Sequence, residues 1–250
     1  MSNQNWLERP EKKSSNPAAK FLEWKSNDKC FGYYDNDLKE KLLKEGKSEF
    51  EIKEGKLANV LVPLPLKFVI LEHYHTVKGW SKTSESNIYA NEVSFTGSEE
   101  LDVKSFKGGN IAKGIYKEIR SKIIDAGGKY HRSIYAVTND FEIINISLKG
   151  AAVSEYSKFI DVNGDNFFTQ NWVEVAEVVE GKKGSITYSS PIFKKSTAIK
   201  DASKIRPFAD ILQAHMNEYM GKERAGSAVD AYELEKSPDV VSPDKDDLPF

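Results

Sequence analysis

The sequence predicts a mainly β fold of the α+β class, in which strands outnumber a few helices. The strand signals are runs rich in β-branched and aromatic residues that Gly and Ser separate, "LANVLVP", "LKFVILEHYHTV" and "SNIYANEVSF". Later segments have the pattern of hairpins, and one four-residue isoleucine repeat indicates a helix between the strand groups. At 250 residues, with 39% of them hydrophobic, the chain is long enough for one sizeable core.

The beginning of the chain is expected to be disordered and then to enter a strand region. Residues 1–19 are polar and contain Pro10 and Pro17, so they are predicted to be disordered. Order is expected to begin at "FLEWKSNDKCFGYYD". The charged stretch that follows, residues 36–56, is predicted to be a helical or loop-like excursion between strands.

The helix between the strand groups is predicted within "GGNIAKGIYKEIRSKIIDAGGKY", residues 108–130. Isoleucine recurs there at every fourth position, with Lys and Glu between, which is the pattern of an amphipathic helix. The pair Gly127-Gly128 supplies the stop signal. The repeat consists of Ile111, Ile115, Ile119 and Ile123.

The second half of the chain alternates between strand pairs and helices. Residues 129–150 are predicted to form two strands around a turn at Thr138-Asn139-Asp140, and residues 150–160 a short helix. Residues 166–194 have the pattern of a hairpin that turns at 181–184. A last helix is predicted after Asp201, over residues 201–225.

These elements together favour a partly open five-stranded barrel of the OB type with added helices, although composition alone also fits a sandwich. The barrel would span residues 20–200. After the helix at 201–225, residues 226–250 are predicted to be a disordered acidic tail.

The distribution of charge predicts a partner that is a polyanion. The formal net charge is −2, but Asp230–Phe250 holds seven acids and two lysines, so the rest of the chain carries +3. A mildly basic body can hold a polyanion, and an acidic tail can compete for the same surface.

Several classes of protein are disfavoured by the sequence. The longest apolar stretch, residues 57–71, contains Pro63, Pro65 and Lys67 and is shorter than the ~20 residues of a bilayer span. The N-terminus lacks the apolar core of a signal peptide, so a cytoplasmic location is expected. Cys30 is the single cysteine, which excludes an intrachain disulfide and a multi-cysteine zinc site.

Aromatic residues with lysines nearby suggest a groove for single-stranded nucleic acid, because bases stack on aromatic faces while lysines neutralise phosphates. Any single aromatic is more often a core or rim residue, so only the set as a whole suggests the groove. The stacking candidates are Trp24, Tyr34, Tyr74, Trp80, Tyr130, Tyr135, Trp172 and Tyr188. The phosphate candidates are Lys25, Lys78, Lys82, Lys129, Arg132, Lys182, Lys183 and Lys194.

The chain ends in "SPDKDDLPF", an acidic run with an apolar tip. Acidic tails are mostly solvated and disordered. A purely solubilising tail has no use for Leu-Pro-Phe, however, since burying a Phe gains roughly 1.5–3 kcal/mol only where a pocket receives it. The tip therefore suggests a ligand for another protein.

With these residues in view, the chain resembles single-stranded DNA-binding proteins. The final "DDLPF" is similar to the acidic tip of the bacterial proteins. The body, from "FLEWK" through "VPLPLKFVILE", "GWS", "NEV" and "LKGAA" to "EGKKGSITYSSPIF", resembles the single-stranded DNA-binding proteins of Bacteroidota phages, including crAss-like ones. The likeness spans about residues 20–195. The helix at 202–223 and the excursion at 36–56 are additions to a minimal barrel.

The resemblance implies a non-enzymatic protein in the cytoplasm of an infected bacterium, without a cofactor, that protects single-stranded DNA during phage replication, recombination and repair. It also implies that the tip docks on replication and recombination proteins. A basic pocket of the partner would take the acids, and an apolar slot would take the Phe. The tip residues are Asp246, Asp247, Leu248, Pro249 and Phe250.

Alternative functions rest on weaker signals. His73 and His75 would point to the same side of a strand, as ligands of a metal-dependent nuclease might, but no third ligand is placed by the sequence. "DVNGDN" resembles the start of a calcium loop, yet Trp172 stands where a bidentate Glu is needed. "KGGNIAKG" before a helix could cradle a phosphate. A further alternative is an inhibitor whose acidic tail mimics DNA.

Overall fold

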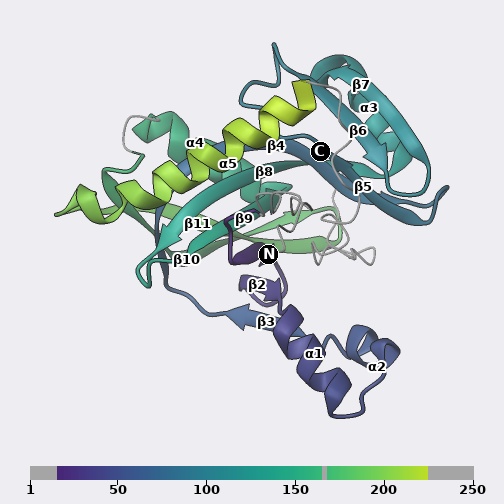
Figure 1. Ribbon diagram of the computed structural model, residues 1–250, viewed down its shortest axis with the longest axis horizontal. Helices are drawn as coiled ribbons and strands as arrows, with labels where there is room; N and C mark the ends of the chain where they lie inside the picture. Colours follow the sequence, from purple (N-terminus) through teal and green to yellow (C-terminus); the bar gives the residue numbers. More distant parts are fainter. Residues whose placement is uncertain (1–15, 165–167, 225–250) are drawn as a thin grey trace, which may run out of the picture.

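Most of the chain's strands join one open, mixed sheet in the computed structural model, which describes residues 16–164 and 168–224 (Figure 1). The pairing of β1 with β9 is parallel, and the other pairings are antiparallel. The order across the sheet is β3 (Asn59–Val62), β2 (Cys30–Tyr34), β1 (Lys20–Lys25), β9 (Ile143–Lys149), β8 (Gly128–Thr138), β4 (Leu66–Ser81), β5 (Ser86–Ala90), β6 (Glu100–Ser105) and β7 (Gly109–Ile115).

A long hairpin pairs with the start of β4 and lies outside this strand order. It consists of β10 (Asn171–Lys183) and β11 (Ile186–Ala198), and β10 pairs with β4 through Val173 opposite Phe68. The predicted hairpin turn at 138–140 is confirmed. The second predicted hairpin is present, but residues 181–183 belong to β10 and the turn lies at Gly184-Ser185, with φ of +60° at Gly184. The mainly β class is confirmed. The sheet stays open, so a five-stranded OB barrel is not confirmed.

The isoleucine repeat spans two elements rather than one helix. Helix α3 (Tyr116–Ala126) includes Ile119 and Ile123, but the first half of the predicted helix is strand β7, which pairs with β6. Gly114, with φ of +147°, lies just before the change from strand to helix. The stop signal is confirmed, because Gly127 ends α3 in the left-handed conformation. The glycine-rich "KGGNIAKG" therefore does not open a helix.

Two helices cover opposite faces of the central strands. Successive residues of a strand point to opposite faces, so one strand packs against both helices. Phe68 and Ile70 of β4 pack with Tyr156 of α4 (Ala151–Asn163). Val69, between them, packs with Leu212 of α5 (Arg206–Arg224), the helix that crosses the sheet in Figure 1. A 3-10 turn, η2 (Ala202–Lys204), precedes α5, so the predicted C-terminal helix is confirmed.

The predicted excursion at residues 36–56 is confirmed as two short helices that project beyond β3 (Figure 1). Asp35 caps α1 (Asn36–Lys44) by accepting a hydrogen bond from the backbone N–H of Leu38. Ser48 and Glu51 form a capping box at the start of α2 (Glu49–Glu54). These local bonds explain why a charged stretch with few apolar residues is helical.

The N-terminal boundary differs from the expectation in one respect. Ala18 is buried against the α5 side of the sheet, and the N–H of Ala19 donates to the carbonyl of Ile143 at 2.8 Å. Residues 16–19 are therefore ordered, which corrects the expected disorder there. Residues 1–15 and the acidic tail lie outside the described residues. No helix in the described part of the chain is long and apolar enough to cross a bilayer.

Candidate functional site

A groove of about 1010 Å³ lies where segments far apart in the sequence meet. Its walls come from the β1–β2 turn, β3, α3, the start of β8, the β9–α4 junction and β11. The lining residues that carry charge or an aromatic ring are Glu23, Trp24, Lys25, Asp28, Lys56, Tyr116, Arg120, Lys129, Tyr130, Lys149 and Tyr188.

The charge of the groove is positive. Five of its lining side chains are Lys or Arg and two are acidic, and one of the acids, Glu23, forms an ion pair with Lys25 at 2.9 Å. Helix α4 also begins at the groove, and its N-cap residue, Gly150, has no side chain to cap the first backbone N–H groups. The positive end of the helix dipole therefore adds to the lysine charges. The groove is suited to an anionic chain.

Three tyrosines supply aromatic surface to this groove, and all three remain partly exposed. Tyr116 of α3 and Tyr130 of β8 lie with ring centroids 5.2 Å apart and planes tilted by 48°. Tyr188 of β11 lies across the groove, where its ring covers Gly181; a Cβ at that glycine would lie 2.4 Å from the ring. These rings offer faces on which a planar ligand can stack.

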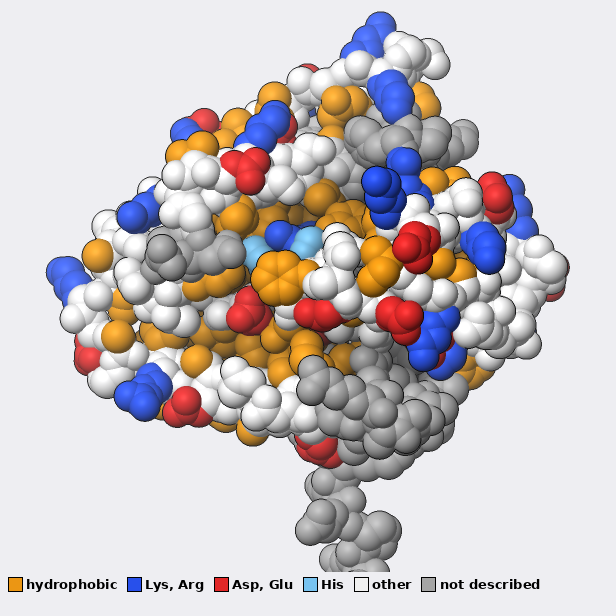
Figure 2. Space-filling view, turned by 90° about the horizontal axis from the view of Figure 1, so that it is seen from above, with side chains coloured by type: hydrophobic (Ala, Val, Ile, Leu, Met, Phe, Trp, Pro, Cys, Tyr) orange, Lys and Arg blue, Asp and Glu red, His pale blue; other side chains and the backbone are white. Residues whose placement is uncertain are grey.

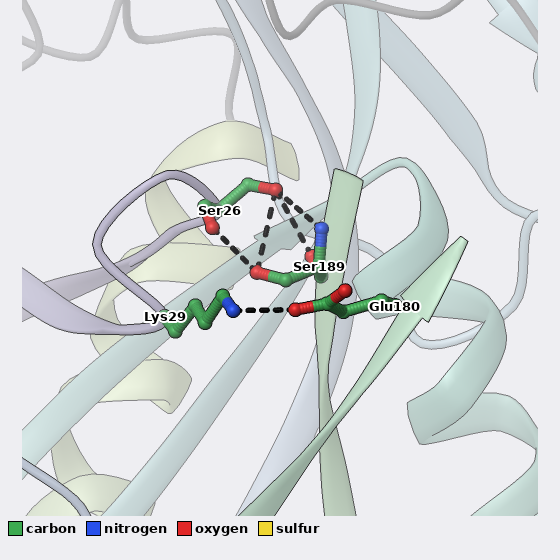
Figure 3. A network of polar contacts seen from close by, with 4 residues as sticks. All are labelled: Ser26, Lys29, Glu180 and Ser189. Carbon is green, nitrogen blue, oxygen red and sulfur yellow. Dashed lines mark hydrogen bonds and ion pairs between the residues drawn. The ribbon is translucent and has the colours of Figure 1, made fainter. Parts of the chain in front are cut away.

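A hydrogen-bond network ties the β1–β2 turn to β11 and so closes one side of the groove (Figure 3). The N–H of Ser189 donates to the hydroxyl of Ser26 at 2.7 Å, and the Ser189 hydroxyl donates to the Ser26 carbonyl at 2.5 Å. Lys29 and Glu180 form an ion pair beside it. The indole N–H of Trp24 donates to the Ser189 carbonyl at 2.8 Å. The network therefore positions Trp24 and, next to Ser189, Tyr188.

Five of the residues predicted from the sequence line the groove: Trp24, Lys25, Lys129, Tyr130 and Tyr188. Sequence reasoning missed Lys56, Lys149, Tyr116 and Arg120. The last two are four residues apart on α3, so they share a helix face. With a predicted helix that begins at residue 116, this spacing would have indicated that the two side chains lie together.

Three of the predicted stacking residues are buried, which corrects their assignment. Tyr74 and Tyr135 pack on each other in the core under α5, with centroids 6.0 Å apart. The Tyr135 hydroxyl donates to Glu92 at 3.0 Å, and burial raises the pKa of this tyrosine well above its usual value. Trp24 reaches the groove but is only 8% exposed and packs edge-on against Phe31. None of the three presents a free ring face.

The remaining predicted residues do not line the groove. Trp172 has the ammonium of Lys67 5.7 Å from its ring centroid. Lys194 forms an ion pair with Glu177 on the β10–β11 hairpin. The others are Tyr34 on β2, Lys78 and Trp80 near the end of β4, Lys82 just after it, Lys182 and Lys183 at the hairpin tip, and Arg132 on β8.

A second concave site lies beside the groove, around Arg132. His73 and His75 share one side of β4, as predicted from the sequence. His73 Nδ1 lies 2.9 Å from the Tyr156 hydroxyl, and His75 Nδ1 lies 2.9 Å from Arg132 Nη1 and within hydrogen-bond reach of the Tyr130 hydroxyl. Burial, followed by the nearby Arg132 charge, lowers the pKa of His73 to about 3 and that of His75 to about 4. Both rings are neutral at pH 7.

The described residues place no third metal ligand beside the two histidines. Among residues 16–164 and 168–224, no group of three His, Cys, Asp or Glu side chains is arranged to hold a metal ion. Asp161 and Asn163 of "DVNGDN" end helix α4, and Gly164 is its C-cap. No specific observation therefore favours the nuclease alternative.

No protein family, curated protein or solved structure matches this chain. The tip residues 246–250 lie outside the described residues, so their partner-binding role stays a prediction.

Proposed function

We propose that this chain binds single-stranded DNA without sequence preference, in the basic groove, and that it is a binding protein and not an enzyme. The observation that supports this most directly is the combination in one groove of five basic side chains with Tyr116, Tyr130 and Tyr188. Lysines neutralise phosphates regardless of sequence, and every base has a face that can stack on an aromatic ring.

The charge of the groove favours a polyanion such as a chain of nucleotides over an uncharged metabolite, because five of its lining side chains are basic and two are acidic. Double-stranded DNA would have to keep its bases inside the duplex, away from the tyrosines. Binding of this kind requires the groove but not a closed barrel. The OB-type barrel stays a prediction.

The biological setting of the proposal comes from the resemblance noted for the sequence. The chain would protect single-stranded DNA in the cytoplasm of a phage-infected bacterium during replication, recombination and repair. Its acidic tip, residues 246–250, would recruit replication and recombination proteins. Only the DNA-binding part of this proposal rests on the groove.

The direct test is a tryptophan-fluorescence titration with poly-dT at several salt concentrations. Affinity should fall with salt, with a log–log slope of about 0.7 per neutralised phosphate. The double variant Lys129→Met/Lys149→Met keeps most of each aliphatic stem and removes two groove charges, so its slope should be smaller by about 1.4. The control Lys41→Met removes a lysine of α1, outside the groove, and should leave the slope unchanged.

Stacking is tested separately with tyrosine variants. Tyr188→Ala should weaken poly-dT binding by about 1–3 kcal/mol, the usual value of one stacked base. Tyr34→Ala removes a partly exposed tyrosine that does not line the groove and should not weaken it. Salt-independent binding, or a clear preference for duplex, would contradict the proposal. No affinity at all, even in a chain truncated at Ser237, would favour the DNA-mimicking inhibitor.

A further inference from the structure

In the second concave site, the positively charged guanidinium of Arg132 lies among neutral and apolar groups. Figure 2 shows histidine and basic side chains next to each other in a recess with apolar walls. The partly exposed residues that make up this recess, which we call the Arg132 hollow, are His73, His75, Tyr130 and Arg132. His73 and Arg132 also contact Tyr156, which is fully buried in the core.

Arg132 has no carboxylate partner among the described residues. Its guanidinium carbon lies 5.9 Å from the centroid of the Tyr156 ring, and one of its nitrogens contacts the ring of His75. A guanidinium has five N–H donors, and neutral imidazole is a weaker acceptor for them than an anion. A partly buried arginine in this state is suited to an anionic ligand that can accept two of its hydrogen bonds.

Acidic side chains near this stretch of β4 belong to the other face of the sheet. His73 is paired with Ile134 and His75 with Arg132, so the hollow is on the α4 face. Glu72 is paired with Tyr135, so it lies on the opposite face of the sheet, where it is exposed. Glu92 accepts the hydrogen bond of Tyr135 on that face. The sheet therefore separates these carboxylates from the hollow.

Aromatic rings connect the hollow to the basic groove without interruption. Tyr116 lies 5.2 Å from Tyr130, and Tyr130 lies 5.7 Å from His75, each distance measured between ring centroids. Tyr156 lies 5.7 Å from His73 in the same way. Tyr130 belongs to both sites, since it lines the groove and its hydroxyl contacts His75. A ligand in the hollow can thus be continuous with one in the groove.

We propose that the Arg132 hollow is a nucleotide site, in which Arg132 pairs with a phosphate group and the partly exposed ring of Tyr130 receives the base. The phosphate would take two guanidinium donors, while the neutral histidines and the Tyr130 hydroxyl offer further hydrogen bonds. The inference rests on the proposed function only for its natural ligand, a DNA strand that extends from the groove. The chemistry of the site can be tested without a strand.

The first test uses the wild-type chain and three small probes: dTMP, thymidine and inorganic phosphate. The ring-nitrogen NMR signals of His75 and His73 report on the hollow directly. They should shift saturably with dTMP, and the affinity for thymidine should be at least tenfold lower because it lacks the phosphate. Inorganic phosphate should shift the same signals at higher concentration. Equal affinities for thymidine and dTMP, or no shift of these signals with dTMP, would overturn the proposal.

Variants then test the role of Arg132. Arg132→Met keeps an unbranched side chain over Tyr156 and removes the charge, so dTMP affinity should fall about tenfold or more, as for other hydrogen bonds to charged groups. Arg132→Lys keeps the charge but not the planar fork, and the loss should be smaller. The control is Lys158→Met, which changes an exposed lysine of α4. Unchanged dTMP affinity in a folded Arg132→Met chain would contradict the assignment.

Oligonucleotides identify the source of the phosphate and separate the two proposals. If the hollow binds a strand end, a 5′-phosphorylated dT oligomer should bind more tightly than its unphosphorylated form, and Arg132→Met should abolish the difference. If it binds an internal phosphodiester, Arg132→Met should weaken both forms equally. Binding of dTMP without oligomer binding would contradict the proposed function alone. Oligomer binding that is independent of Arg132, without dTMP binding, would contradict the hollow alone.

Discussion

Three histidines of this chain are held neutral by the fold. His73 and His75 lie in the Arg132 hollow, and His131 is buried on the other face of the sheet, where its ring contacts the Ser147 hydroxyl at 3.0 Å. Burial is the largest cause in each case, and it lowers the pKa of His131 well below the usual value. Each ring gains a proton on unfolding at pH 5.

This difference predicts that the protein loses stability in mild acid. Between the unfolded pKa of about 6.5 and the folded values, the unfolded chain binds protons that the folded chain does not. The contribution of these neutral histidines to the free energy of unfolding is fully present above pH 6.5. It is lost as the pH falls toward 4 and 3, the approximate pKa values of His75 and His73 in the folded protein. One such histidine gives a slope of up to about 1.4 kcal/mol per pH unit.

Urea unfolding at pH 7, 6 and 5 measures this slope. His73→Phe keeps an aromatic ring beside Phe168, whose centroid is 5.1 Å away, and removes one titrating group. Its slope between pH 6 and 5 should be smaller than that of the wild type, whatever its stability at pH 7. The same slope in both chains would show that His73 titrates alike when folded and unfolded.

At the scale of elements, the junction between α3 and β8 leaves no room for a Cβ at two glycines. Gly127 has φ of +95°, and a Cβ there would lie 2.3 Å from the carbonyl oxygen of Trp80. Gly79, on the neighbouring β4, would place a Cβ 2.4 Å from the carbonyl oxygen of Gly127. The two glycines let β4 and the end of α3 approach closely, which positions the helix whose Tyr116 and Arg120 line the groove.

Gly127→Ala should therefore destabilise the protein by about 3 kcal/mol or more, because left-handed strain and a backbone clash add. Gly46→Ala is the matched control. Gly46 also has a positive φ, of +89°, but a Cβ there would have nothing within 4 Å. It should cost only the 1–2 kcal/mol or so of the left-handed conformation. Thermal or urea unfolding of both variants gives the comparison, and equal losses would contradict the argument.

The connection between β11 and the β1–β2 turn offers a second matched pair. Ser189→Ala removes the hydroxyl that donates to Ser26 and should cost about 1 kcal/mol of stability. It should also weaken poly-dT binding, since Tyr188 is the next residue. The neighbouring Ser190 has a buried hydroxyl without a hydrogen-bond partner among the described residues, so Ser190→Ala should be neutral or stabilising. Urea unfolding and poly-dT titration of both variants test this contrast.

For the molecule as a whole, charge is the property that couples the parts. The chain carries −2 overall, yet the groove in its body is lined by five basic side chains. The acids of Asp230–Phe250 and the phosphates of DNA have the same sign, so we predict that they compete for the same groove. The competition should weaken with salt.

Truncation at Ser237 should tighten poly-dT binding at low salt, and the difference from the full chain should shrink as salt is raised. Deletion of Phe250 alone should leave DNA affinity unchanged and abolish pull-down of replication proteins, because it removes the apolar tip and keeps the side-chain charges. Fluorescence titration and pull-down of the three chains measure these effects. Equal affinity of the full and truncated chains at low salt would contradict the competition.

Much of the element list could be predicted from local patterns. The β-branched runs became β3, β4 and β5, the turn at 138–140 joins β8 to β9, and the segment at 150–160 is helical. The helix predicted from the isoleucine repeat was wrong in its first half, because Ile111 and Ile115 belong to β7, which pairs with β6. This tertiary pairing outweighed the local helical period. The prediction that Tyr74 and Tyr135 stack on bases was wrong, because an aromatic residue in a strand has the same local sequence pattern whether its face of the sheet is covered or open.

By itself, the sequence determined the class, the segments, the separation of charge between body and tail, and the presence of aromatics and lysines enough for a groove. The tertiary structure alone decided which of them meet. Lys56, Arg120 and Lys149 come together from the α2–β3 turn, α3 and β9, and Arg132 lies apart from them with two neutral histidines. The physical reason is that local patterns encode which face of an element is apolar, whereas a site depends on non-local strand pairing and on which helix covers each face.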